Sequence, residues 1–575
     1  MVGGLIAACH SGDVRELPEV APAPSALDAG SDASLDGASP EPNDAGPVGG
    51  NGGNGGSMVL TPGGDGGVDI HDGGDAEADA AIEAGPPCGD GHTDLALGEE
   101  CDDGNQQHSD GCEIDCKKTR IVEMAVGAFS TCALSNGGGV KCWGGDMRGA
   151  LGRGTDGADA PDPMQIDVLD FGTSRRVTKL VGNWSHFCVV FEDDRARCWG
   201  ANSYGQLGIG TLLDYGDDLD EPLNALPDLP ITSIKEIAVS SSHTCVISDA
   251  AGTNSLHCWG PNGYGSLGIG STVDKNTADT NDPAQLNAEP QQVTLGFGVP
   301  CVIYGDGLVR CFGRHYFAGL GCGLIDFDIG NGIGDGNGLG ELPDNPLFDV
   351  KGLPGPARAI TGNSSTFCAL IVDQLYCWGQ NWDAETGQSP LLVGTKVWEA
   401  MGPVSLGDVS VTQAAVARAH ACALDDHGVV RCWGSNERDQ EISGQWEEGA
   451  LGYPGHAHVG LDREPVLDYQ LMSGFVVDGG PTDAAIPGAE SLPLGAVDVG
   501  DFDGIAGLDP VEHIWVGYRA TCVLIQNGGV RCWGKNDFNR LGYGIAIPNI
   551  GYTQSPAELY AEVGFSDLEV FGPPL

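Results

Sequence analysis

The chain has 575 residues, of which 27 are basic and 81 are acidic, so its formal net charge is −54. Binding to a phosphate backbone depends on neutralisation by Lys and Arg, so this balance argues against nucleic acid as a partner. The sequence contains no run of about 18 or more apolar residues, and we therefore expect no membrane-spanning helix.

Residues 1–9 have the pattern of a truncated lipoprotein signal. They end in Ile6-Ala7-Ala8-Cys9, which resembles a lipobox and makes Cys9 the expected lipidation site. The charged segment that normally precedes such a signal is missing, so either the true start lies upstream or this is an apolar N-terminus with a stray cysteine. Residues 10–87 contain no aromatic residue and no cysteine, which predicts a disordered acidic tether or a low-complexity leader without that role.

Residues 88–118 are predicted to form a small disulfide-rich module. Four cysteines occur within 29 residues that offer almost no other core: Cys88, Cys101, Cys112 and Cys116. Four cysteines allow three pairings, and the sequence does not choose among them. The stretch Gly98-Glu-Glu-Cys-Asp-Asp-Gly-Asn105 resembles the core of the myxobacterial cysteine-rich disulfide repeat.

Three carboxylates in this module, Asp102, Asp103 and Asp110, could hold a calcium ion, because hard cations prefer several oxygen ligands. The alternative is that they are solvated turn residues. We expect no cofactor and at most weak calcium binding.

One stretch recurs seven times in the remainder of the chain. It consists of two apolar-alternating runs around a Gly-rich turn, such as Asn136-Gly137, with one cysteine before the turn and Cys-Trp-Gly after it, which predicts a β-hairpin. In five copies the cysteines are ten residues apart and face each other across the strands, at a separation of roughly 4.5–5.5 Å that suits a disulfide. Zinc binding is the alternative, but the spacing is too wide for zinc knuckles. The expected pairs are Cys132–Cys142, Cys188–Cys198, Cys245–Cys258, Cys301–Cys311, Cys368–Cys377, Cys422–Cys432 and Cys522–Cys532.

Each hairpin has similar neighbours. A strand-like run such as Ile121–Val126 precedes it, and an Asn/Gly/Leu loop such as Asn202-Ser-Tyr-Gly-Gln-Leu-Gly208 follows most copies. Successive Cys-Trp-Gly motifs lie 56, 60, 53, 66, 55 and 100 residues apart, which suits one four-stranded unit per copy. The pattern resembles the regulator of chromosome condensation repeat family, in the Cys-paired form of its secreted bacterial branch. That resemblance implies an all-β, seven-bladed β-propeller over residues 119–575.

Three departures from the repeat stand out. Phe312 replaces the tryptophan of the fourth copy, and the fifth copy lacks the usual loop, having Asn381-Trp-Asp-Ala-Glu-Thr-Gly387. The 100-residue step predicts an insertion around residues 450–505 rather than an eighth blade. Cys322 is left over from the pairing and is expected to be a free, shielded thiol.

Other candidate residues support no specific chemistry. His186, His243 and His420 precede the first hairpin cysteine by two residues and are interpreted as packed residues of their own blade cores, with a metal-binding ring as the alternative. The stretches 326–337 and 500–504 start like calcium loops but lack the Gly and Glu that such loops require. We find no nucleophile elbow, zinc-protease helix or phosphate-binding loop.

The function expected from the sequence is therefore general. We expect an exported, surface-anchored and monomeric propeller that binds a protein or glycan at the cell surface and is not an enzyme. The alternatives are a surface hydrolase or lyase, or an enzyme inhibitor that uses one propeller face. Nucleotide exchange, which the family resemblance would imply, disagrees with the export, the disulfides and the acidity. Systematic cysteine pairing indicates an oxidising compartment, which suits a secreted or cell-surface lipoprotein.

Overall fold

The computed structural model contains one compact unit over Pro86–Leu575. It describes residues 88–154, 157–250, 252–314, 319–322, 349–381, 386–387, 395–397, 400, 402–435, 450–451, 458–459, 497, 499, 510–526, 528–544, 549–550, 556, 567–568 and 570–571. The predicted lipidation site Cys9, the predicted tether, both calcium-loop-like stretches and most of the predicted insertion lie outside these residues.

The described chain forms seven antiparallel sheets, or blades, each contiguous in sequence. Blades 5 to 7 have four strands, and in blades 1 to 4 the outermost strand is reduced to single bridges such as Gly144 to Ala160. In order, the strands are β1 Ile121–Val126, β2 Ser130–Ser135 and β3 Val140–Gly144; β4 Val177–Asn183, β5 His186–Phe191 and β6 Ala196–Gly200; β7 Ile234–Val239, β8 Thr244–Ser248 and β9 Ser255–Trp259; β10 Pro290–Leu295, β11 Pro300–Tyr304 and β12 Val309–Cys311; β13 Ala359–Asn363, β14 Thr366–Ile371, β15 Gln374–Asn381 and β16 Thr395–Val397; β17 Val411–Val416, β18 His420–Asp425, β19 Val430–Ser435 and β20 His458–Val459; β21 Val511–Gly517, β22 Ala520–Ile525, β23 Val530–Lys535 and β24 Asn549–Ile550.

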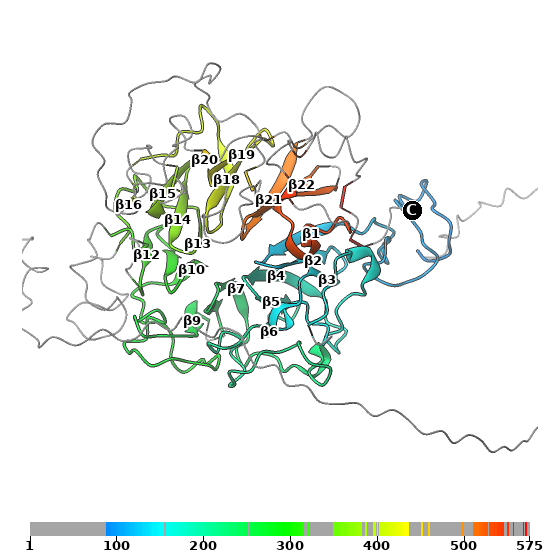
Figure 1. Ribbon diagram of the computed structural model, residues 1–575, viewed down its shortest axis with the longest axis horizontal. Helices are drawn as coiled ribbons and strands as arrows, with labels where there is room; N and C mark the ends of the chain where they lie inside the picture. The colour runs from blue at the N-terminus through cyan, green and yellow to red at the C-terminus, as the bar shows by residue number, and fades with distance from the viewer. Residues whose placement is uncertain are drawn as a thin grey trace, which may run out of the picture. The chain divides into compact units, whose positions relative to one another are not determined.

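The blades close into a ring, which confirms the predicted seven-bladed β-propeller. The first strand of each blade contacts the first strand of the next, from β1 through β4, β7, β10, β13 and β17 to β21, and β21 contacts β1 again. Figure 1 shows these strands gathered around a common centre with the other strands outside them. Among the described residues, the last blade consists of β21 to β24 alone, so closure depends on packing between blades 7 and 1.

Each hairpin carries the disulfide that the repeat predicts. In every blade the two cysteines are directly opposed in the register of the second and third strands, as Cys132 is to Cys142. Their Cα atoms are 4.0–4.1 Å apart, which is closer than expected for unlinked opposed residues. The bond draws the two strands together at the buried centre of each blade.

The tryptophan of the Cys-Trp-Gly motif joins neighbouring blades. Its ring is buried, and its indole N–H donates to a backbone carbonyl in the loop of the preceding blade. Such bonds join Trp143 to Arg540, Trp199 to Ala150, Trp259 to Gln206, Trp378 to Gly319 and Trp533 to Ala450, at 2.8–3.1 Å. Phe312 keeps an aromatic ring fully buried in blade 4, but it has no donor for this bond.

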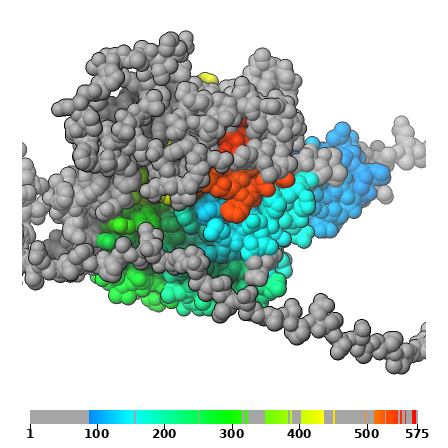
Figure 2. All heavy atoms as spheres, viewed as in Figure 1, coloured from blue at the N-terminus to red at the C-terminus, as the bar shows by residue number. Residues whose placement is uncertain are grey.

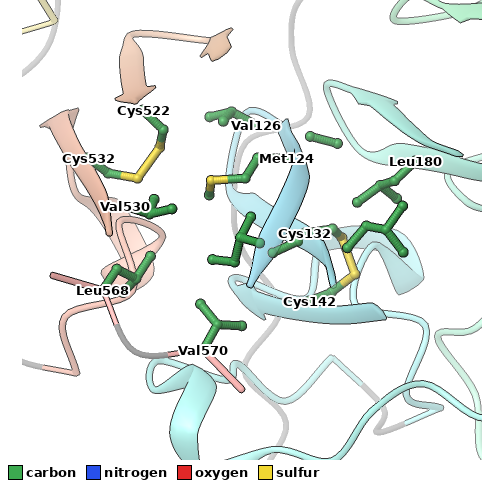
Figure 3. Close-up of a cluster of buried hydrophobic side chains, with 14 of the residues drawn as sticks. Met124, Val126, Cys132, Cys142, Leu180, Cys522, Val530, Cys532, Leu568 and Val570 are labelled. Carbon is green, nitrogen blue, oxygen red and sulfur yellow. A yellow bond between two sulfur atoms is a disulfide. The ribbon is translucent and has the colours of Figure 1, made fainter. Parts of the chain in front are cut away.

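The junction of blades 7 and 1 is reinforced at two levels. The apolar side chains of Val530, Leu568 and Val570 pack with Met124 in one buried cluster, which Figure 3 shows between the two hairpin disulfides. Beside it, the buried guanidinium of Arg540 donates to the carbonyls of Gly127 and Ala128 in blade 1 and to those of Lys535 and Arg519 in blade 7. The C-terminal segment therefore closes the ring without sharing a sheet with blade 1.

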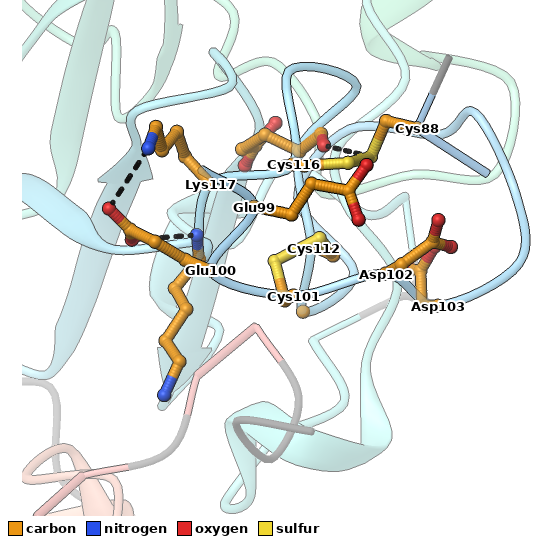
Figure 4. The surroundings of a disulfide bond; sticks show 12 residues. Cys88, Glu99, Glu100, Cys101, Asp102, Asp103, Cys112, Cys116 and Lys117 are labelled. Atoms are coloured by element: carbon orange, nitrogen blue, oxygen red, sulfur yellow. Dashed lines mark hydrogen bonds and ion pairs between the residues drawn. A yellow bond between two sulfur atoms is a disulfide. The ribbon is translucent and has the colours of Figure 1, made fainter. Parts of the chain in front are cut away.

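The small module contains two nested disulfides, Cys88–Cys116 and Cys101–Cys112. Figure 4 shows them close together, with the carboxylate of Glu100 paired with Lys117. This pairing is one of the three that the sequence left open.

The module packs on the hairpin turn of blade 1. The Ser109 hydroxyl lies 2.5 Å from that of Ser135 and accepts from the Gly139 amide, and the Asn136 side chain donates to the carbonyl of Lys118. Figure 2 shows the module in blue next to the cyan surface of the first blades.

Candidate binding face

The propeller has two faces that differ in their side chains. Because the strands are antiparallel, the turns between first and second strands lie on the same face as the loops after the third strands, which we call the loop face. The turns between second and third strands form the opposite, hairpin-turn face, and the module contacts blade 1 there. The loop face is therefore on the side of the propeller opposite to that contact.

Large side chains occupy an equivalent turn position of the loop face in four blades. The position is four residues before the first hairpin cysteine, and it holds Trp184, Phe297, Arg418 and Tyr518. The other three blades have Ala128, Ser241 and Ser364 there. Trp184, Phe297 and Arg418 are exposed at this position, and Tyr518 is half-buried.

A second position on the loop face repeats this arrangement. It lies in the loop after the third strand, two residues beyond the Asn or Asp that begins it, and holds Arg148, Tyr204, Tyr264 and Phe538. Arg148 and Phe538 have left-handed backbone conformations, with φ of 61° and 58°. In each loop the Asn or Asp side chain accepts from a backbone amide five residues on, as Asn202 does from Leu207, which fixes the loop.

The aromatic side chains of blades 7, 1 and 2 form one cluster, in which Trp184 and Phe538 are exposed and Phe129 and Tyr518 are half-buried. Phe129 contacts Trp184 and Phe538 edge-on, with ring centroids 6.3 and 5.9 Å apart, and Trp184 contacts Tyr518 at 5.2 Å. Trp184, Phe538, Tyr204, Tyr264 and Phe297 are 38–58% exposed. Exposed rings that already pack on one another offer a large apolar area at a small cost in conformational entropy.

Guanidinium groups surround these rings. Arg519 and Arg418 lie 5.0 and 5.6 Å from the ring centroid of Tyr518. In a second group, Arg314 lies 5.1 Å from the Tyr264 ring and 5.4 Å from the Phe297 ring. The chain carries a net charge of −54, so these cations are a local exception to its acidity. We call the set of turn, loop and arginine residues on the loop face the aromatic face.

A ring of polar side chains lines the axis between the blades. Each reaches from one first strand to the next: Glu123 accepts from the Leu180 amide at 2.7 Å, Gln292 accepts from Ile360, and Gln413 pairs with both backbone groups of Ile514. Lys179 forms an ion pair with Glu236 at 2.9 Å. These contacts cover the unpaired inner edges of the first strands.

Of the titratable groups described in this ring, Glu123 alone has a markedly shifted pKa. Burial raises its pKa to about 7, against the lowering effects of the Leu180 amide and of Lys179. It lies in a cavity of about 420 Å³ along the axis. A protonated carboxyl near neutral pH could donate a proton to a bound molecule.

The three predicted histidines are buried, but one detail of their interpretation is wrong. His186 contacts Thr244 of the next blade at 3.1 Å and His420 contacts Thr521 of the next blade at 3.0 Å, so both bridge blades rather than fill their own. The reason is that the faces of neighbouring sheets pack directly against each other. Burial lowers the pKa to about 3 for His186 and His420 and to about 4 for His243, so all three are neutral at pH 7.

The carboxylate of Asp102 in the module is bound by the protein's own backbone. Asp102 accepts from the backbone amides of Gly104, Gly89, Gly91 and Asp90 at 2.8–3.2 Å, and these bonds lower its pKa to about 2. Asp102 is therefore engaged by backbone amides, and calcium binding by Asp102, Asp103 and Asp110 stays a prediction. Cys322 is buried.

The sequence interpretation missed the aromatic face and the axial ring. The signal for the first was available, since aligning the seven copies on their first cysteine places Trp184, Phe297 and Tyr518 at one turn position. The axial ring had a signal as well, since the same alignment places its members nine residues before the first cysteine. The sequence did not show that these side chains reach the next blade, because a β-bulge in the first strand sets their direction and becomes visible only in the strand register.

Within the described residues no helix is long and apolar enough to cross a membrane. The nine disulfides are consistent with an extracellular protein.

Comparison with known proteins points to one repeat family. Sequence profiles of the regulator of chromosome condensation (RCC1) repeat match residues 177–206, 194–247 and 411–440. The chain is 27% identical to the ultraviolet-B receptor UVR8 of Arabidopsis thaliana over 56% of its own length and 66% of that protein. It is 25% identical to the human E3 ubiquitin-protein ligase HERC2 over 56% of its length, but it spans only 6% of HERC2.

Among solved structures, human WBSCR16 aligns with a TM-score of 0.42 and 19% identity over 55% of this chain and 77% of that one. Yeast Prp20p, whose structure is described with its binding to Gsp1p and histones, aligns with the same TM-score and identity over 55% and 72%. The matching profiles show that the chain contains regulator of chromosome condensation repeats at residues 177–247 and 411–440, within its ring of seven blades.

Proposed function

We propose that this protein is an exported binding module that engages a protein partner through its aromatic face. Propellers of this repeat family act in general as binding or regulatory modules, and family members bind proteins. The observation that carries the proposal is the cluster of Phe129, Trp184, Tyr518 and Phe538, of which Trp184 and Phe538 are exposed, with arginines beside it. Trp, Tyr and Arg are the residues that contribute most to the affinity of protein interfaces.

The scaffold supports this role by holding the face rigid. Every blade that presents a turn or loop residue is cross-linked by a disulfide and joined to its neighbours through the buried tryptophans or Phe312. A preorganised surface loses little conformational entropy on binding, so more of the contact energy is retained as affinity. The arginines further favour a partner with acidic groups, which would pair with them across the interface.

The placement of the small module supports a surface-anchored arrangement. The module contacts the hairpin-turn face, and the predicted tether of residues 10–87 precedes Cys88. A lipid on Cys9 would therefore anchor the protein through the tether and the module. Oxidising conditions, which nine disulfides favour, agree with this location.

The proposal is tested by capturing partners from the native cell surface with the intact protein and matched variants. The face variant combines Trp184→Ala and Tyr518→Ala, and the control is Leu308→Ala, which removes an exposed side chain from the hairpin-turn face. We expect one stoichiometric protein with the wild type and the control, and its loss with the face variant. Equal recovery with all three proteins would contradict the proposal.

One observation supports the alternative of a surface hydrolase or lyase. Glu123 has a raised pKa in an axial cavity, which is the environment of a general acid. Against it, the second carboxylate of the axial ring, Glu236, is paired with Lys179, and the funnel of several carboxylates that this function needs is absent from the described lining. Turnover of a polysaccharide panel by the wild type but not by Glu123→Gln would favour this alternative.

A further inference from the structure

The axial ring of polar side chains is interrupted in blade 5. At the position where the other blades carry a long polar side chain, blade 5 has Ala359. The register shows that this is the same position: Ala359 opposes Leu370 as Gln413 opposes Leu424. The six other members are Glu123, Lys179, Glu236, Gln292, Gln413 and His513.

The first strand of the neighbouring blade 6 also carries a smaller side chain than its counterparts. Blade 6 has Ala414 where every other blade has a larger apolar residue on its first strand, such as Ile360 or Ile514. Two positions on the neighbouring first strands of blades 5 and 6 therefore lack side-chain volume. The removal of one polar and one apolar side chain from neighbouring blades predicts a cavity between them.

A cavity is present at this place. The axial cavity of about 420 Å³ is lined by Ala359, Gln413 and Ala414, together with Gln292 and Glu123. A second cavity of about 450 Å³ shares Gln292 and Ala359 with it and adds the side chains of Glu236 and Arg358. These volumes are in the range of small-molecule sites, which combine an apolar wall with a few polar groups.

The intact blades show which group belongs in the gap. The amide of Gln413 accepts from the Ile514 N–H at 3.0 Å and donates to the Ile514 carbonyl at 2.9 Å. The amide oxygen of Gln292 likewise accepts from the Ile360 N–H at 3.0 Å. By the same register, the backbone groups of Ala414 face Ala359, whose methyl group can neither accept nor donate a hydrogen bond.

We propose that this cavity binds a small molecule that carries a primary carboxamide. Its oxygen accepts from the Ala414 N–H, and its NH₂ group donates to the Ala414 carbonyl, as Gln413 does one blade further on. The amide NH₂ of Gln292, which has no hydrogen-bond partner among the residues described, donates to a second acceptor on the same molecule. A neutral amide suits the place better than a carboxylate, because Glu123 lines the same cavity. This site is separate from the aromatic face and does not depend on the partner proposed above.

The test measures binding of L-glutamine and of the smaller propionamide to the intact chain, by calorimetry and by the shift in melting temperature. We expect both amides to bind the wild type, and L-glutamate to bind more weakly than L-glutamine. Ala359→Gln supplies the missing amide from the protein, so it should raise the melting temperature without ligand. It should also weaken glutamine binding by about tenfold or more, the equivalent of one to two lost hydrogen bonds.

Ala414→Ile is the second variant, because it fills the same cavity from the apolar side, and it should weaken binding in the same direction. Leu308→Ala lies on the hairpin-turn face outside the cavity and should bind like the wild type. The proposal is overturned if neither amide binds the wild type. It is also overturned if all four proteins bind glutamine equally, since the ligand would then occupy another place and the cavity would hold water alone.

Discussion

Closure of the ring between blades 7 and 1 should depend strongly on Arg540. Its side chain is buried, and it donates to two carbonyls of blade 1, Gly127 and Ala128, and to two of blade 7. Hydrogen bonds to a charged donor contribute about 1.5–3 kcal/mol each, and the cost of burying the charge offsets part of that sum. We therefore expect Arg540→Ala to lower the free energy of unfolding by about 3 kcal/mol.

The assay is guanidinium unfolding with the disulfides intact, combined with hydrogen exchange of the first strands. Arg540→Ala should lower the unfolding midpoint and accelerate exchange in β1 and β21 more than in β10. Arg540→Gln is the matched control, because blade 2 has Gln206 at the same loop position, and it should retain part of the stability. A change below about 0.5 kcal/mol, with exchange in β1 unaltered, would refute this account of the closure, since that is the effect of an ordinary surface substitution.

Three further predictions concern the blades and the axis. Trp199→Phe removes the donor to the Ala150 carbonyl and leaves that group buried, so it should cost about 1–2 kcal/mol in denaturant unfolding; an unchanged midpoint would contradict the role of the indole. The pKa of Glu123 is raised to about 7 in the folded protein. The contribution of its protonated form to the free energy of unfolding is therefore complete below about pH 4.5 and is lost as the pH rises to 7, by up to about 1.4 kcal/mol per pH unit. Glu123→Gln should therefore gain stability relative to the wild type between pH 5 and about pH 7.5, and a constant difference in melting temperature would count against the shift. Val372 has a φ of 57° in an exposed turn, so Val372→Gly should raise the free energy of unfolding by about 0.5–1 kcal/mol, and a lower melting temperature would show that the turn is unstrained.

The fold could be predicted from the sequence because the repeat unit is local. Cysteines placed symmetrically about a turn, as Cys132 and Cys142 are, define a hairpin and its register within about a dozen residues. Seven such units leave few architectures that bury all their faces. The disulfide bonds and the propeller predicted on this basis are confirmed by the structure.

The pairing within the module could not be predicted, because it depends on contacts between segments. Cys88 reaches Cys116 only when the chain between them folds back, and the four backbone amides that converge on Asp102 hold that fold. The sequence shows that Asp102 is present but not which amides it binds. For this reason a calcium ligand and a structural carboxylate could not be distinguished beforehand.

The candidate sites were harder to predict than the fold, since they combine residues of different blades. Trp184 and Tyr518 are 334 positions apart in sequence, yet their rings meet because blades 2 and 7 both flank blade 1. The gap at Ala359 and Ala414 has the same origin, since an alanine is unremarkable on a strand until the register places it opposite a missing partner. Ring closure therefore creates both sites.

The most direct test of the aromatic face is a site-specific photocrosslink on the native cell surface. A photoreactive residue replaces Tyr204 on the loop face in one protein and Leu308 on the hairpin-turn face in another, both positions being exposed. Our account predicts a discrete cross-linked protein from position 204 and none from position 308. Adducts that form at 308 alone, or equally at both positions, would contradict it.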